Sequence, residues 1–395
     1  MKKTIYLHIG MPKTGTSSIQ RFLYENRLAL EKKGVLYPPV LCKGEGIVVT
    51  PPEEIVNLKL LFWKTMSLFY KDVANSKKML RECWQKEYMP FIKASSATTV
   101  ILSAEELLSN NDISYLPHLF EMIKEEFDLK IIAYLRKPAE YVVSLWGEMT
   151  KVHKENPITC TLTQWIFQPM LCNWIIRPIP YDNLNYIINL LGAENVVIRP
   201  FEKCQFKNGN LIDDFLDIFN IERDNELKLL KPENESYGRS GCEFAILINK
   251  LNLTAYKRKE LHSLLSSKDN DVKLIETLSD EYIEHITRQY SETLKRLANI
   301  YGKDSFFTSD YPDCYKKERP AYNNVIISLD EIRYLQEAID RIANGQGKYS
   351  VLLHDSKVFL TIKYFVYRVL CNFVSGGTKI KCKEKRDLYK QALSL

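Results

Sequence analysis

Patterned cysteines and a strong excess of one charge are both missing from this sequence of 395 residues. Nine cysteines are present, but none form a C-x-x-C pair, so neither a metal site nor a disulfide framework is indicated. We therefore expect reduced thiols in a cytoplasmic protein that requires no metal. The net charge of +6 is too small to indicate a nucleic-acid partner, and we expect none.

Segments that could cross a membrane or direct secretion are also scarce. No charge-free run of about 20 apolar residues occurs, which argues against a spanning helix. The first apolar stretch is too short and too polar for a secretory signal, and a buried strand explains it better. The chain contains no internal repeat and no low-complexity tract.

Short β-rich segments alternate with segments of helical periodicity in the first half of the chain. This alternation predicts an α/β fold, a P-loop-type three-layer sandwich with a central, mainly parallel sheet. Such sheets bind ligands at the carboxyl ends of their strands. The predicted strands are 4–9, 35–37, 99–103, 129–135 and 195–201, and the predicted helices are 15–33, 54–72, 76–92, 139–152 and 181–191.

The second half of the chain is predicted to be mainly helical. We expect one α/β domain over residues 1–302, in which 205–300 is helical. A linker rich in Asp, Pro, Tyr and Lys is expected over 303–324, followed by a helical C-terminal extension over 325–395.

A glycine-containing loop follows the first predicted strand. From Gly10 it reads G-M-P-K-T-G-T-S, close to the phosphate-binding pattern G-x-x-x-x-G-K-[ST], but Thr16 occupies the lysine position and the lysine is Lys13. Backbone N–H groups and hydroxyls still surround a predicted helix N-terminus, where an anion is stabilised. The loop therefore suits a 5′-phosphate that carries a second anionic group, without an obligatory metal.

The stretch PKTGTSSIQ resembles the 5′-phosphosulfate loop of sulfotransferases that use 3′-phosphoadenosine 5′-phosphosulfate (PAPS). This resemblance implies that Lys13 stabilises charge on the bridging oxygen as the sulfuryl group leaves. It also implies that the loop binds the donor, through Pro12, Lys13, Thr14, Gly15, Thr16, Ser17 and Ser18.

A second stretch, AYLRKPAEYVVSLW, resembles the 3′-phosphate signature of the same family. That signature has an arginine at a strand end, a proline shortly after it, and a serine eight residues beyond the arginine; Arg136, Pro138 and Ser144 match it. A guanidinium fork suits phosphate oxygens, and proline is tolerated in the first turn of a helix. Both motifs together indicate the PAPS-dependent sulfotransferase family, and a third stretch, NVVIRPFE, resembles the late core strand of its bacterial and Golgi-type carbohydrate branch.

Two later stretches are less specific. Arg199 in NVVIRPFE faces either the ligand or a structural ion-pair partner. Ser236 and Arg239 in NESYGRSG stand where relatives add a contact to the donor, although a plain loop before a helix also explains them. The motif that cytosolic animal enzymes carry in that region is absent, which leaves this part of the pocket undefined.

The implied reaction is in-line transfer of a sulfuryl group, which requires a general base for the acceptor proton. Glu105 follows a predicted strand at the ligand-binding edge and is the leading candidate; a stabilising acid at a helix N-terminus is the alternative. His153 is a weaker candidate, and we expect His118 and His8 to be structural.

The leading acceptor class is a carbohydrate, polysaccharide or glycolipid, since the resemblance points to that branch; small phenols, lipids and peptide tyrosines are the alternatives. Trp165 and Trp174 either line an acceptor groove or pack inside an insert. Residues 356–375 are apolar and precede a basic run at 379–386, so this end either lies on the inner face of a membrane or forms a packed helix with a solvated tail.

Two other classes of function stay open from the sequence. One is a P-loop kinase that uses ATP and magnesium. The displaced lysine argues against it, and so does the lack of a strand ending in Asp. The other is an inactive glycan-binding or membrane-associated scaffold, against which Lys13, Arg136 and Ser144 argue together. The sequence does not identify the acceptor, the position modified or the oligomeric state.

Overall fold

The computed structural model describes just over half of the chain. The chain divides into two compact units: residues 1–145, 177–233 and 284–311 form the first, and residues 146–176, 234–283 and 312–395 form the second. The predicted linker and C-terminal extension lie almost entirely outside the described residues, so those boundaries stay predictions. The described residues are 2–39, 72–104, 106–109, 113–151, 158–167, 181–229, 239–249, 278, 280–308 and 387.

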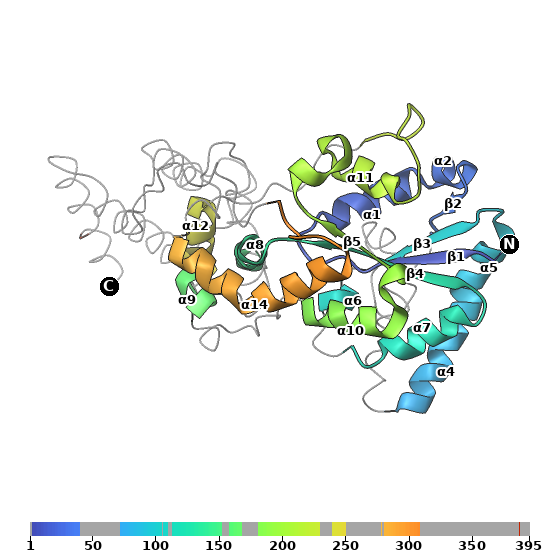
Figure 1. Ribbon diagram of the computed structural model, residues 1–395, viewed down its shortest axis with the longest axis horizontal. Helices are drawn as coiled ribbons and strands as arrows, with labels where there is room; N and C mark the ends of the chain where they lie inside the picture. Colours follow the sequence, from blue (N-terminus) through green and yellow to red (C-terminus); the bar gives the residue numbers. More distant parts are fainter. Residues whose placement is uncertain are drawn as a thin grey trace. The chain divides into compact units, whose positions relative to one another are not determined.

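The first unit is built on a five-stranded sheet in which every described pair of strands is parallel (Figure 1). The strand order is β2-β3-β1-β4-β5, so β1 lies in the centre. The sheet confirms the predicted α/β class and all five predicted strands. The strands are β1 (Thr4–His8), β2 (Val35–Leu36), β3 (Thr99–Ser103), β4 (Asp128–Leu135) and β5 (Val196–Pro200).

Helices cover both faces of this sheet and complete the predicted three-layer sandwich. One face carries α1 (Thr16–Glu25), α2 (Arg27–Lys32) and α11 (Leu211–Asp217), and the other carries α6 (Glu106–Ser109), α7 (Leu116–Lys124) and α10 (Tyr181–Leu191) (Figure 1). The helices that follow β1 and β3 therefore lie on opposite faces. A crevice at the carboxyl ends of such neighbouring strands is the usual place for a ligand.

Apolar residues at helical spacing explain why α1 and α11 cover the same face. Ile19, Phe22 and Leu23 of α1 are buried in one core cluster with Phe215 and Leu216 of α11. The spacing of three and four residues places these side chains on one side of each helix. Burial of this cluster fixes the first turn of α1 against the sheet, directly after the glycine-containing loop.

Two predicted helices differ from their observed form. The segment 15–33 is broken at Asn26, whose amide Nδ2 donates to the carbonyl of Phe22 (2.9 Å) while its Oδ1 accepts from the backbone of Lys228 (2.9 Å). The segment 76–92 is part of α4 (Val73–Cys83), the π-helical η2 (Trp84–Tyr88) and α5 (Met89–Ala94). Pro90 lacks an N–H, and the wider π turn before it accommodates the missing hydrogen bond.

The described part of the second unit is helical. It contains the end of α8 (Pro138–Thr150), together with α9 (Leu162–Phe167) and α12 (Arg239–Asn249). Asn249 ties this unit together, because its Nδ2 donates to the carbonyls of Thr150 (3.0 Å) and Ile158 (2.9 Å).

The long helix α14 (Asp280–Ile300) returns the chain to the first unit. There, the ring of Tyr290 packs edge-on against Tyr181 of α10, at 5.7 Å between ring centroids. Within the residues that the structure describes, none of the helices combines the length and the apolarity that crossing a bilayer demands. The predicted helix 54–72 and the apolar C-terminal segment fall outside those residues.

Candidate functional site

The loop after β1 has a backbone shape that only a few residues tolerate. Lys13 and Gly15 both have positive φ angles, 66° and 73°. The hydroxyl of Thr14 donates to the carbonyl of Met11 (2.6 Å) and holds the turn closed. A Cβ on Gly15 would lie 2.3 Å from Cδ2 of Leu211, so the positive φ and the close side chain both favour glycine at this position. Thr16 follows this turn and is the first residue of α1.

The N-terminus of α1 is open to an anion. Gly15 is its N-cap residue, no side chain caps the helix there, and its first turn contains no acidic residue. Ser17 and Ser18, the next residues of that turn, are exposed. Backbone N–H groups at an uncapped helix start, together with the helix dipole, stabilise a negatively charged group.

Arg136 joins this loop to the second sequence motif. Its Nη1 donates to the backbone carbonyl of Lys13 (2.9 Å) and to Oγ of Ser144 (3.1 Å). Its Nε donates to Glu140 (3.2 Å), and its guanidinium carbon lies 5.6 Å from the ring centroid of Phe201. The structure thus brings together three residues that the sequence analysis selected from segments 123 positions apart.

The turn that carries Arg136 is held by residues that the sequence analysis did not select. The hydroxyl of Tyr181 donates to the carbonyl of Arg136 (2.5 Å). Lys137, the next residue, forms a buried ion pair with Glu202 (2.6 Å). Glu140 lies four positions after Arg136, in the first turn of α8, whereas Arg136 lies in the turn before that helix. The partners of Lys137 and Tyr181 come from distant segments and carry no local signal.

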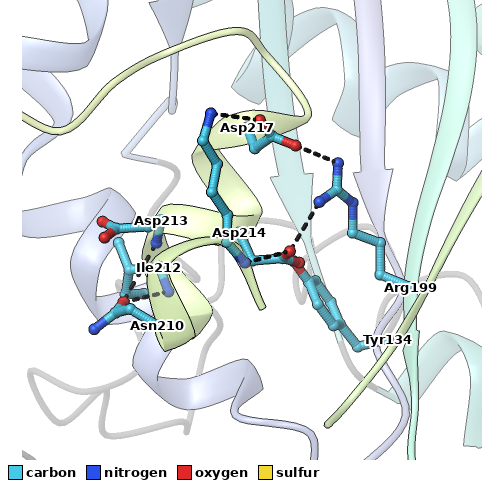
Figure 2. Close-up of polar contacts among 8 residues, drawn as sticks. Tyr134, Arg199, Asn210, Ile212, Asp213, Asp214 and Asp217 are labelled. Atoms are coloured by element: carbon cyan, nitrogen blue, oxygen red, sulfur yellow. Dashed lines mark hydrogen bonds and ion pairs between the residues drawn. The ribbon is translucent and has the colours of Figure 1, made fainter. Parts of the chain in front are cut away.

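Arg199 belongs to a polar network on the α11 side of the sheet (Figure 2). Its Nη1 pairs with Asp214 and its Nη2 with Asp217, both at 2.9 Å. Tyr134 donates to the second oxygen of Asp214 (2.6 Å), and Lys207 pairs with Asp217 (2.7 Å). Of the two roles predicted for Arg199, the structure shows the ion pair. The network ties β4 and β5 to α11.

The same network sets the position of the helix that crowds Gly15. Asn210 caps α11, since its Oδ1 accepts from the backbone N–H groups of Ile212 (2.9 Å) and Asp213 (3.3 Å) (Figure 2). Burial, followed by the nearby Asp214 carboxylate, raises the pKa of Tyr134, which keeps its hydroxyl a donor. Leu211 begins this helix, so the network also fixes the wall of the loop.

His8 is fully buried, as predicted, but its Nε2 has no hydrogen-bond partner among the described residues. Its Nδ1 lies 2.8 Å from Oγ of Ser103, which also accepts from Nε2 of Gln20 (3.0 Å). Burial lowers the pKa of His8 from 6.5 to about 3, so the imidazole is neutral near pH 7. His118 lies in α7 with its Nδ1 3.6 Å from a carboxylate oxygen of Glu121.

Several predicted site residues cannot be placed. Glu105, His153, Trp174 and Ser236 lie outside the described residues, so their predicted roles stay predictions. Arg239 is the first residue of α12 in the second unit, and only its backbone is described. Trp165 has an exposed fraction of 2%, which favours packing inside the insert over the lining of an acceptor groove.

Comparisons with known proteins give distant matches. No protein-family model matches the chain. It is similar to a sulfotransferase from Alicyclobacillus acidocaldarius, at 13% identity and a TM-score of 0.38, over 80% of this chain and 100% of that one. The sulfotransferase domain from the curacin biosynthetic pathway matches at 13% identity and a TM-score of 0.34, over 73% of this chain and 97% of that one.

A third structure, a retinol dehydratase in complex with androsterone and the inactive cofactor PAP, matches at 11% identity and a TM-score of 0.24, over 85% of this chain and 80% of that one. Among curated proteins, a Schizosaccharomyces pombe protein whose name suggests a mitochondrial ribosomal recycling factor is 27% identical over 142 residues. That match covers 35% of this chain, and the chain spans about half of that protein's length (46%). Because all these similarities are distant, the function proposed below rests on the residues of this chain.

Proposed function

We propose that this chain is a PAPS-dependent sulfotransferase, which moves a sulfuryl group from PAPS to a hydroxyl or amine of an acceptor. The observation that carries the proposal is the position of Arg136, whose Nη1 lies 2.9 Å from the carbonyl of Lys13 and 3.1 Å from Oγ of Ser144. One guanidinium thereby joins an anion-binding loop to a second phosphate-binding motif. A nucleotide with phosphates on both its 5′ and its 3′ oxygens fits that combination.

The residues present suit the donor at both ends. Residues 12–18 form the loop and the first turn of α1, which would hold the 5′-phosphosulfate through backbone N–H groups and hydroxyls. Arg136 and Ser144 would hold the 3′-phosphate, since a guanidinium fork and a hydroxyl both donate to its oxygens. Ser236 and Arg239 stay candidates for a further contact to the donor.

Catalysis in this proposal is positioning together with electrostatic stabilisation. Lys13 stands in the middle of the loop and would neutralise the bridging oxygen as the bond to sulfur breaks. Glu105 is the proposed general base, which takes the proton from the acceptor hydroxyl or amine while that oxygen or nitrogen attacks sulfur. The electron pair of the broken bond stays on the departing phosphate oxygen.

The P-loop kinase is the competing function, and the loop itself argues against it. A nucleotide-hydrolysing loop uses a lysine at the position where this chain has Thr16, a residue that is 2% exposed at the start of α1. A scaffold without chemistry would not need Lys13, Arg136 and Ser144 to lie together.

The acceptor class is the finer part of the proposal. We infer a carbohydrate, polysaccharide or glycolipid acceptor from the resemblance of NVVIRPFE to the bacterial and Golgi-type branch, and from the carboxylate of Glu105 as the proposed base. A cytoplasmic enzyme with a peripheral place on the inner face of a membrane would meet lipid-linked glycans there. The basic run at 379–386 supports this placement through its attraction to anionic lipids.

The test is a transfer assay. The protein is incubated with sulfur-labelled PAPS and a panel of glycans, glycolipids, phenols and peptides, with and without EDTA. We expect label on a carbohydrate acceptor and no effect of EDTA. Phosphate transfer from ATP that EDTA abolishes, with no label from PAPS, would establish the kinase instead.

A further inference from the structure

Lys137 and Glu202 form an ion pair beside the proposed 3′-phosphate site. Lys137 follows Arg136 at the end of β4, and Glu202 follows the end of β5. Their Nζ and Oε1 atoms are 2.6 Å apart, and the side chains are only 3% and 7% exposed. A pair this well shielded from water is uncommon, because two charges are removed from solvent together.

The carboxylate of Glu202 also binds a third segment. Its Oε2 accepts from the backbone N–H of Thr308 (3.0 Å), from the Thr308 hydroxyl (3.3 Å) and from Nε2 of Gln205. The residue just before Glu202 is bonded too, since the N–H of Phe201 donates to the carbonyl of Leu135 (2.6 Å). The β4 turn, the β5 turn and the segment after α14 therefore meet at one carboxylate.

Lys137 is the link between Arg136 and the start of α8. Its carbonyl accepts the N–H of Tyr141 (2.9 Å), the first hydrogen bond of that helix. Pro138 follows it, and a residue before proline is restricted in its backbone conformation. With its side chain also anchored, Lys137 leaves the backbone of Arg136 little freedom.

We propose that the buried Lys137–Glu202 pair is a positioning device for the donor's 3′-phosphate: it holds the turn that aims Arg136. The inference rests on the proposed function and adds to it two buried residues that are not among the proposed donor contacts. The loop that would hold the 5′ end has its own supports, in Thr14, Gly15 and α11. Because Arg136 also donates to the carbonyl of Lys13, loss of the pair should weaken recognition of the 3′-phosphate more than recognition of the 5′ end.

The experiment compares the affinities of two nucleotides by calorimetry on the full chain. Adenosine 3′,5′-bisphosphate (PAP) contacts both ends of the site, and AMP lacks the 3′-phosphate. The variants are Glu202→Gln, Lys137→Met and the double variant K137M/E202Q, which leaves no buried charge. Glu125→Gln is the matched control, because it breaks an exposed ion pair with Arg81 between α4 and α7.

In each single variant we expect PAP to bind about tenfold more weakly, the effect of one poorly aimed charged hydrogen bond. The affinity for AMP should fall by much less, and Glu125→Gln should change neither affinity. The double variant should fold even if a single variant does not, because no unpaired charge remains, and it should keep the lower PAP affinity. A folded double variant with the wild-type ratio of PAP to AMP affinity would overturn the inference. A wild-type protein without preference for PAP would instead overturn the proposed function.

Discussion

Substitution of Gly15 by alanine tests the loop on which the proposed donor site depends. The new Cβ would lie 2.3 Å from Cδ2 of Leu211 and 3.3 Å from Cε2 of Phe201. Gly15 also has a φ of 73°, which alanine adopts only at a cost. Gly34 offers a matched control, because its φ is 83° and nothing lies within 4 Å of its added Cβ.

The two substitutions should differ by the cost of the clash alone. A left-handed alanine costs about 1–2 kcal/mol, offset by roughly 0.4–1 kcal/mol of lost entropy in the unfolded chain. Gly34→Ala should therefore destabilise the protein by about 1 kcal/mol. Overpacking against Leu211 adds about 1–2 kcal/mol, the lower part of the usual range, because the clashing atom ends a side chain. Gly15→Ala should thus destabilise by about 2–3 kcal/mol.

The assay is urea unfolding of the wild type and four variants: Gly15→Ala, Gly34→Ala, Leu211→Ala and G15A/L211A. In the Leu211→Ala background the 2.3 Å contact is gone and only the 3.3 Å contact with Phe201 remains, so substitution at position 15 should cost only slightly more than Gly34→Ala does. Equal destabilisation by Gly15→Ala and Gly34→Ala in the wild-type background would refute the account of the crowded loop.

Three further substitutions test the site and its supports. Lys13→Ala should lower kcat by about 100-fold or more and leave the affinity for PAP nearly unchanged, because its charge is needed as the bond to sulfur breaks; transfer at the wild-type rate would remove Lys13 from the mechanism. Tyr134→Phe should destabilise the protein by about 1–3 kcal/mol, since the buried Asp214 loses a hydrogen-bond donor. A change of less than a few tenths of a kcal/mol in the free energy of unfolding, measured in urea, would contradict this. The third substitution concerns pH. The pKa of His8 is about 3 in the folded protein and 6.5 in the unfolded chain, so below pH 6.5 the unfolded chain binds a proton that the folded chain does not. The free energy of unfolding therefore falls as the pH drops below 6.5. Between pH 6.5 and 5 the loss should be about 2 kcal/mol, and His8→Gln should remove that slope in urea unfolding; an equal slope in both proteins would show that His8 is not its source.

Local signals explain why the sheet and the two motifs could be predicted. Each strand is a short apolar run, and each motif lies within one strand–loop–helix segment, so neighbours in sequence carry the information. Their meeting at one edge followed from the shared direction of parallel strands. Arg136 could therefore be assigned to the same edge as Lys13 from the sequence alone.

The remaining features depend on partners that are remote in sequence. Asn26 ends α1 because its side chain accepts a hydrogen bond from the backbone of Lys228, 202 positions away. Arg199 alternates with buried residues of β5, but the aspartates that bind it lie on α11, whose placement no local pattern gives. Glu202 meets Lys137 only because Leu135 and Pro200 are paired in the sheet. Register and helix placement, rather than composition, decide these contacts.

The central claim is that the loop at Lys13 and the guanidinium of Arg136 hold opposite ends of one nucleotide. Calorimetric titration of the wild type and of Arg136→Ala with PAP and with AMP tests it most directly. The account predicts that the wild type prefers PAP and that Arg136→Ala weakens PAP by about 10- to 100-fold, while AMP affinity falls by much less, because the loop loses only the hydrogen bond from Arg136 to the carbonyl of Lys13. A wild type that binds PAP no more tightly than AMP, or a variant that loses both nucleotides equally, would contradict it.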